Sequence, residues 1–271
     1  MPVIILDRNV ISLIKDVNSG KVISDSNKLN MLSQLRELDI PENKISSIFS
    51  IIEGQKGRVE TLEEKESVAQ LETTALKIFF KKAKIDYYPI NNIKYLYSSI
   101  CTLGSHLNTK IAMGKFLKKA RPLLQDIISP KNRDHIAEKL FKLAKECKIS
   151  SHEGGFLALL ISLLCLFEDV NALKLVKFKK NEKIKPYNAL NDILHLINFI
   201  KIKTYLVNLD SYTNVSFLTM DKALNGLYSY IKNISKKDIN NQNLVAYKLE
   251  FSEDLENILP AAILENFLQY K

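Results

Sequence analysis

Tryptophan is absent from the chain, and glycine, proline and cysteine are scarce. With 8 Gly and 7 Pro among 271 residues, the composition weighs against long disordered segments. The three cysteines, Cys101, Cys147 and Cys165, stand far apart and are odd in number, which argues against a zinc site and against a disulfide framework. The core must come from the hydrophobic residues, 46% of the chain, which suffice for one large domain or two smaller ones.

Long hydrophobic runs are missing as well. Asp7 and Arg8 interrupt the N-terminal apolar residues too early for a secretory signal peptide. The uncharged run over residues 154–167 has 14 members. A helix that spans a bilayer needs about 20, so this run fits a buried helix better. We therefore expect a cytoplasmic protein without membrane contact.

The charge balance is basic. Lysine and arginine number 39 against 30 aspartate and glutamate, which gives a formal net charge of +9. Such an excess favours an anionic partner such as nucleic acid. Two lysine clusters are candidates for contact with a phosphate backbone, although a solvated surface explains them equally well. Their members are Lys115, Lys118, Lys119, Lys177, Lys179 and Lys180.

Hydrophobic periodicity predicts an α/β protein with strands near both ends and a helical middle. Val3–Leu6 and Val215–Thr219 are expected to be buried strands, and residues 244–249 also have strand character. Helices are predicted over residues 27–38, 63–83, 92–103, 111–119, 134–148, 153–167, 189–201 and 222–232. The expected buried face of the helix over 63–83 consists of Val68, Leu71, Ala75, Leu76 and Phe79.

Each of the two predicted strands leads into an aspartate. Asp7 follows Val3–Leu6 directly, and Asp221 lies just beyond Val215–Thr219. If the strands are parallel neighbours, both carboxylates lie at the sheet edge where ligands bind in open α/β folds. Like charges there repel each other unless a cation neutralises them. An all-oxygen site of this kind suits Mg²⁺ or Mn²⁺.

Two further acids stand in apolar helical surroundings. Asp192 lies in the first turns of a predicted helix, and Glu53 ends the apolar stretch over residues 45–53. Ordinary structural roles remain open for these acids and for Asp221. Asp192 or its neighbour Asn191 could cap one helix and Asp221 the next, while Glu53 could simply face solvent.

Four segments resemble, in their order along the chain, the motifs of the PIN-domain nuclease family. They are Ile5-Leu-Asp7-Arg-Asn9, Ser47–Glu53, Asn191–Leu196 and Phe217–Asp221. The resemblance implies a PIN-like parallel sheet flanked by helices. It also implies four catalytic, metal-binding acids, Asp7, Glu53, Asp192 and Asp221, and two supporting oxygen donors, Asn9 and Thr219.

The long stretch between Glu53 and Asp192 departs from the family pattern. It predicts a discontinuous nuclease core over residues 1–57 and 186–271, with a mostly helical insertion over residues 58–185. Alternatively, Glu153 replaces Glu53 as the second acid.

The resemblance further implies a Mg²⁺- or Mn²⁺-dependent nuclease, most often a ribonuclease, in which metal-activated water hydrolyses a phosphodiester bond. Many relatives in that family are toxins of toxin–antitoxin or phage-defence systems, so an antitoxin, another regulatory protein or a second copy of the chain are candidate partners. The alternative is a non-catalytic module that binds nucleic acid or protein on a degenerate PIN-like fold. Phosphatases of the haloacid-dehalogenase type are disfavoured, because Asn9 occupies the place of their second aspartate.

Overall fold

The computed structural model describes residues 1–53, 60–98, 105–149, 155–178, 186–207, 214–239 and 244–270. The chain forms two compact units. The sheet unit comprises Met1–Leu103 and Lys201–Asp221, and the helical unit comprises Gly104–Ile200 and Lys222–Lys271.

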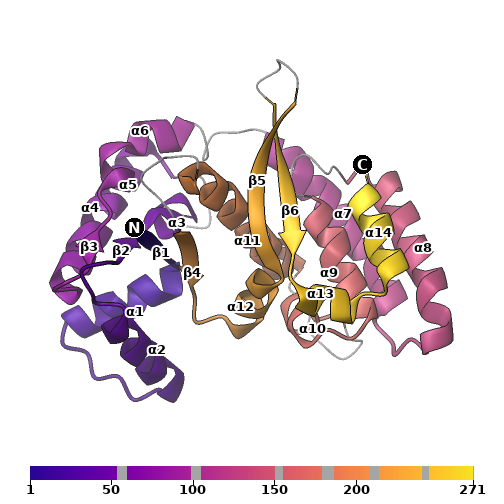
Figure 1. Ribbon diagram of the computed structural model, residues 1–271, viewed down its shortest axis with the longest axis horizontal. Helices are drawn as coiled ribbons and strands as arrows, with labels where there is room; N and C mark the ends of the chain where they lie inside the picture. The colour runs from indigo at the N-terminus through magenta and orange to yellow at the C-terminus, as the bar shows by residue number, and fades with distance from the viewer. Residues whose placement is uncertain are drawn as a thin grey trace. The chain divides into compact units, whose positions relative to one another are not determined.

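The sheet unit is built on four short parallel strands in the order β3-β2-β1-β4 (Figure 1). The strands are β1 (Pro2–Leu6), β2 (Lys44–Ser46), β3 (Lys84–Ile85) and β4 (Asn214–Leu218). β1 pairs in parallel with both β2 and β4, although β4 is more than 200 residues away in the sequence. The expectation of an α/β fold with a parallel sheet is therefore confirmed, and the two aspartate-bearing strands meet the condition of being parallel neighbours.

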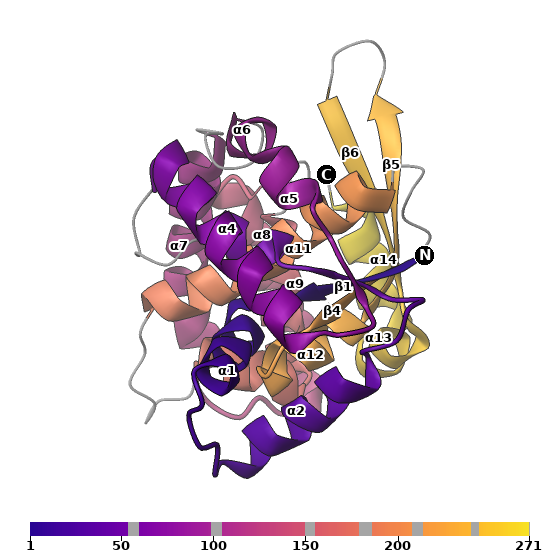
Figure 2. The ribbon, with the colours of Figure 1, turned by 90° about the vertical axis from the view of Figure 1, so that its left-hand side faces the viewer.

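Helices flank this sheet. They are α1 (Arg8–Asn18), α2 (Ser26–Glu37), α3 (Ile48–Glu53), α4 (Leu62–Phe79), α5 (Tyr88–Asn91) and α6 (Ile93–Leu96). Helices α1, α2 and α4 pack on one face through a cluster that includes Ile4 and Leu6 (Figure 2). Val3 and Ile5, which alternate with them, are also fully buried. A strand buried on both faces explains the uninterrupted apolar run at the N-terminus.

The helical unit contains most of the remaining elements. Its helices are α7 (Ser105–Leu124), α8 (Pro130–Glu146), α9 (Phe156–Leu166), α10 (Val170–Val176), α12 (Lys222–Ser229), α13 (Glu253–Ile258) and α14 (Ala261–Gln269). Strands β5 (Ile231–Ile239) and β6 (Leu244–Phe251) form an antiparallel hairpin. Helix α11 (Pro186–Val207) contributes residues to both units.

Helix α9 is the apolar helix expected from the uncharged run, and its residues from Leu157 onward are buried. Among the described residues, no single helix has both the length and the hydropathy to cross a bilayer. Helices α9 and α10 meet these criteria only as a pair that is bent by 119°.

The predicted division of the chain differs from the observed units. Helix α4 and strand β3 fall within the predicted insertion over residues 58–185, yet both belong to the sheet unit. The reason is that β3 pairs with β2 through Lys44 and Ile45, which extends the sheet beyond residue 57. Whether the helical unit is an insertion into a nuclease core stays a prediction.

The predicted buried face of α4 is wrong at Leu71, whose side chain is 66% exposed. Lys65 and Glu72 on the same helix are buried instead. Sequence patterns assign apolar residues to the inside, but charged side chains can be buried when hydrogen bonds or ion pairs compensate them. Both residues have such partners, and these contacts bear on the candidate site described below.

A buried tyrosine links two elements of the helical unit. The Tyr230 hydroxyl donates a hydrogen bond of 2.5 Å to Asp169, whose other carboxylate oxygen caps α10 by accepting from the Ala172 amide at 2.7 Å. The Asn171 side chain donates to the Tyr230 oxygen at 3.3 Å. Burial, together with the hydrogen bond to Asp169, raises the pKa of Tyr230 to about 12.

This pKa predicts a loss of stability in alkali. The folded state holds the phenolic proton more tightly than the unfolded chain, so the free energy of unfolding should fall as pH rises from about 10 to about 12. Denaturant titrations across this range should show that Tyr230→Phe has a shallower decline than the wild type. Equal slopes in the two proteins would contradict the assignment.

Candidate functional site

Strands β1 and β4 end side by side. Leu6 is in register with Leu218, and the Asp7 amide donates to the Leu218 carbonyl at 2.9 Å. The next residues of both chain segments, beginning with Asp7 and Thr219, therefore emerge together at the carboxyl edge of the sheet. In open α/β sheets this edge is where ligands bind.

Thr219 and Asn9 tie the two strand ends together by hydrogen bonds. The Thr219 hydroxyl donates to Oδ2 of Asp7 at 2.5 Å and accepts from the Asn9 side-chain amide at 3.1 Å. It also accepts from the Asp221 amide at 3.0 Å, while Oδ1 of Asn9 accepts from the Met220 amide at 3.2 Å. The two residues that the resemblance marks as supporting donors thus connect Asp7 to the loop that carries Asp221.

Asp7 also begins a helix. Its Oδ1 accepts from the Arg8 amide at 2.7 Å, and Asp7 is the N-cap of α1. The side chain is only 4% exposed. A buried carboxylate is costly unless it is hydrogen-bonded, and the helix N-terminus and the Thr219 hydroxyl both compensate it. The structural role of Asp7 as a cap and a role at a site are therefore compatible.

Glu53 ends α3 near the same edge. Its Oε1 lies 3.9 Å from Nη1 of Arg8, the residue that follows Asp7. The Arg8 side chain is 41% exposed and that of Glu53 19%. Among the predicted acids, the Asp7 carboxylate and the backbone amide of Asp221 thus bond the same Thr219 hydroxyl, and Glu53 lies beside the neighbour of Asp7.

The short helix that carries Glu53 is held by buried charges on α4. The Lys65 ammonium donates to the carbonyl oxygens of Ile51 at 2.5 Å and Ile52 at 3.1 Å, and lies 3.1 Å from the Glu60 carboxylate. These carbonyls lie at the C-terminal end of α3, where a cation is favourable. Lys65 therefore acts on the backbone directly before Glu53.

A second buried acid anchors the middle of α3. The Ser50 hydroxyl donates to Glu72 at 2.8 Å, and the Lys15 ammonium lies 3.6 Å from the same oxygen. Glu72 is fully buried. The sequence did not indicate a role for Lys65 and Glu72, because charged residues within a helix normally mark a solvent-facing surface. Their seven-residue spacing, which places both on one helical face, was the available signal.

Asp86 is a further acid that the sequence analysis missed. It follows β3, and its carboxylate accepts from the Ser46 hydroxyl at 2.7 Å and from the Tyr88 amide at 3.2 Å. The Lys44 ammonium lies 3.9 Å away. These contacts secure the ends of β2 and β3. Strand β3 has only two residues and is too short to show any periodicity. The one available signal for Asp86 was that it directly follows the apolar residue Ile85.

The other predicted residues belong to the helical unit or lie outside the described residues. Asp192 is half-buried on α11 within the helical unit, one turn before His195, and its role stays a prediction. Lys177 is exposed at the end of α10. Three candidates, Glu153, Lys179 and Lys180, lie outside the described residues. Exposed positions on α7 are occupied by Lys115, Lys118 and Lys119.

The donors at the sheet edge suit a hard cation by their chemistry. Asp7, Asn9, Thr219, Asp221 and Glu53 all offer oxygen, the ligand type that Mg²⁺ and Mn²⁺ prefer. Within the described ranges, no three His, Cys, Asp or Glu side chains are grouped closely enough to hold a metal ion. The donor set therefore fits a divalent cation by the chemistry of its oxygen atoms.

Comparisons with known proteins add no relative. A scan against protein-family models and searches of curated proteins and of solved structures returned no match for this chain.

Proposed function

We propose that the chain is a divalent-metal-dependent nuclease with a PIN-like fold and that RNA is its substrate. The observation that carries this proposal is the joint ending of β1 and β4, where the Thr219 hydroxyl connects the buried Asp7 carboxylate to the backbone amide of Asp221. The order of the four resembling segments along the chain supports it as well. A toxin or phage-defence role, with an antitoxin as partner, rests on the resemblance alone.

Each residue has a distinct task in this proposal. Asp7, Asp221 and Glu53 would hold Mg²⁺ or Mn²⁺, which when bound supplies an activated water and neutralises charge on the phosphate. For Asp192, a metal-binding role rests on the resemblance alone. Thr219 and Asn9 orient the Asp7 carboxylate through the hydrogen bonds described above. Arg8, beside Glu53 and partly exposed, offers a cation to the anionic substrate.

Cleavage assays test the proposal. Labelled RNA and DNA of one sequence are incubated with the purified chain and Mn²⁺ or Mg²⁺, then with a chelator, and then with excess metal. We expect RNA cleavage that stops with the chelator and resumes with the metal. Because loss of an outer partner of a metal ligand costs about 10- to 100-fold, Asp7→Asn, which alters a ligand itself, should reduce the rate by at least about 100-fold.

Asp16→Asn is the matched control, because Asp16 lies on α1 at the surface and pairs with Lys21 at 3.1 Å. It should cut at the wild-type rate. Cleavage that ignores the chelator, or an Asp7→Asn variant that cuts like Asp16→Asn, would refute the proposed site. Absence of cleavage with all metals and substrates would favour the binding-module alternative.

A further inference from the structure

The positive charge of the chain is concentrated in one helical pair. Residues 105–149, which contain α7 and α8, have eleven Lys and Arg against four Asp and Glu, a net charge of +7. The whole chain carries +9. Over Ser105–Leu124, helix α7 contains five cationic residues and no acidic residue. Surface helices of soluble proteins usually intersperse both signs, so a one-sign helix calls for an anionic partner.

Three lysines of α7 share one exposed side of the helix. Lys115, Lys118 and Lys119 are separated by three and four positions, the spacing that stacks side chains on one helical face. All three are exposed, whereas Phe116 and Leu117 between them are buried. The lysines therefore face solvent because the other side of α7 packs into the helical unit.

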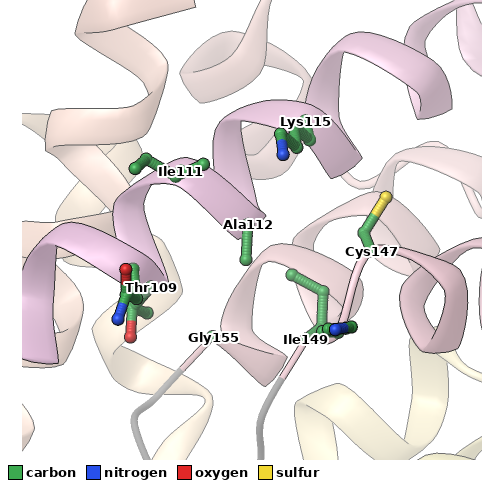
Figure 3. Close-up of a pocket in the computed structure, with 9 residues that line it drawn as sticks. Thr109, Ile111, Ala112, Lys115, Cys147, Ile149 and Gly155 are labelled. Carbon is green, nitrogen blue, oxygen red and sulfur yellow. The ribbon is translucent and has the colours of Figure 1, made fainter.

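A cavity of about 350 Å³ opens next to this face. Figure 3 shows Thr109, Ala112 and Lys115 along α7, opposite Cys147 and Ile149, which follow α8. Asn108 and Lys148 also line it. Among the described residues that line it are two lysines, one threonine and one asparagine, and none of these described lining residues is acidic.

Two lysines of α7 interact electrostatically with Cys147, on the opposite side of this cavity. Burial raises the pKa of the Cys147 thiol, and the positive charges of Lys119 and Lys115 oppose that shift. Both lysines therefore lie close to the segment that follows α8. Lys148, in the left-handed conformation with φ 56°, adds its ammonium to the cavity from that segment. Glu146 is the acid whose negative charge also acts on this thiol.

We propose that this basic surface, made of Lys115, Lys118, Lys119, Lys148 and the adjoining cavity, binds the phosphodiester backbone of single-stranded RNA. Exposed ammonium groups in a row supply contacts that do not depend on sequence. The cavity, at the small end of the range for ligand sites, suits one phosphate or one nucleotide. A flat anionic membrane would use the lysines but leave the cavity and its hydrogen-bonding side chains without a role.

The proposal rests on the proposed function only for the choice of RNA, and its test does not require cleavage. Binding of fluorescein-labelled single-stranded RNA is followed by anisotropy in the Asp7→Asn background. Replacing Lys115, Lys118 and Lys119 together with glutamine should weaken binding at least tenfold. If each lysine contacts one phosphate, the slope of log affinity against log salt should also become shallower by about 2, since each contact contributes about 0.7.

A matched control is the triple variant Lys81→Gln, Lys82→Gln and Lys84→Gln, which removes the same charge from three exposed lysines of the sheet unit. It should bind RNA like the parent, as should the triple lysine-to-arginine variant of α7. Glu146→Gln should bind more tightly. Equal losses in the α7 and control glutamine variants, or binding to phosphatidylglycerol vesicles without binding to RNA, would overturn the proposal. RNA binding through α7 without any cleavage by the wild type would instead count against the nuclease assignment alone.

Discussion

Lys65→Met should lower the free energy of unfolding of the sheet unit by about 3–5 kcal/mol, the usual cost of removing one partner from a buried ion pair. Lys65 is only 4% exposed and Glu60 only 2%. The substitution takes the ion pair from Glu60 and one hydrogen bond each from the carbonyls of Ile51 and Ile52. Methionine fills a similar volume, so the loss reports charge and hydrogen bonding rather than a cavity.

Denaturant unfolding checks this expectation, with Lys94→Met as the control. Lys94 is an exposed lysine on α6, and its replacement should change the stability by less than about 0.5 kcal/mol. Adding Glu60→Gln to Lys65→Met should recover part of the loss, because the buried carboxylate charge then disappears. A Lys65→Met variant as stable as Lys94→Met would show that the buried pair does not hold α3.

The sequence predicted the two strand ends that matter most for the site. An apolar run that leads into an aspartate is visible without any homologue, and parallel sheets need strands that are apolar on both faces. The sequence therefore predicted both strands, at Val3–Leu6 and Val215–Thr219. It did not show that they pair, which the structure establishes. The hydrogen bonds that join Asn9 to Thr219 could not be predicted, since they depend on the register of distant segments.

Elements that carry no periodicity escaped prediction. Strand β3 has two residues, and its pairing with β2 decides that α4 belongs to the sheet unit rather than to the helices that follow. The helix predicted over residues 222–232 ends at Ser229, and its last two residues open strand β5 instead. The sequence of β5, with lysine and isoleucine at irregular spacing, lacks the alternation that identifies a strand.

The burial pattern of α4 was predicted wrongly for a different reason. Leu71, predicted to be buried, is exposed, whereas Lys65 is buried because its ion pair with Glu60 and its hydrogen bonds compensate the charge. Such contacts are specific to tertiary structure, and a composition-based pattern cannot anticipate them. We therefore expect Lys65 and Glu72 to be the positions where sequence-based design of this fold would most readily fail.

Calorimetric titration of Mn²⁺ into the purified chain measures whether the acids at the sheet edge bind a divalent cation. Wild type and Asp16→Asn should bind Mn²⁺ with the same affinity. Asp7→Asn should bind it at least about 100-fold more weakly, since even the loss of an outer partner of a ligand costs about 10- to 100-fold. Each factor of ten in affinity corresponds to about 1.4 kcal/mol. Equal Mn²⁺ affinities of Asp7→Asn and Asp16→Asn, with both variants folded, would contradict the account.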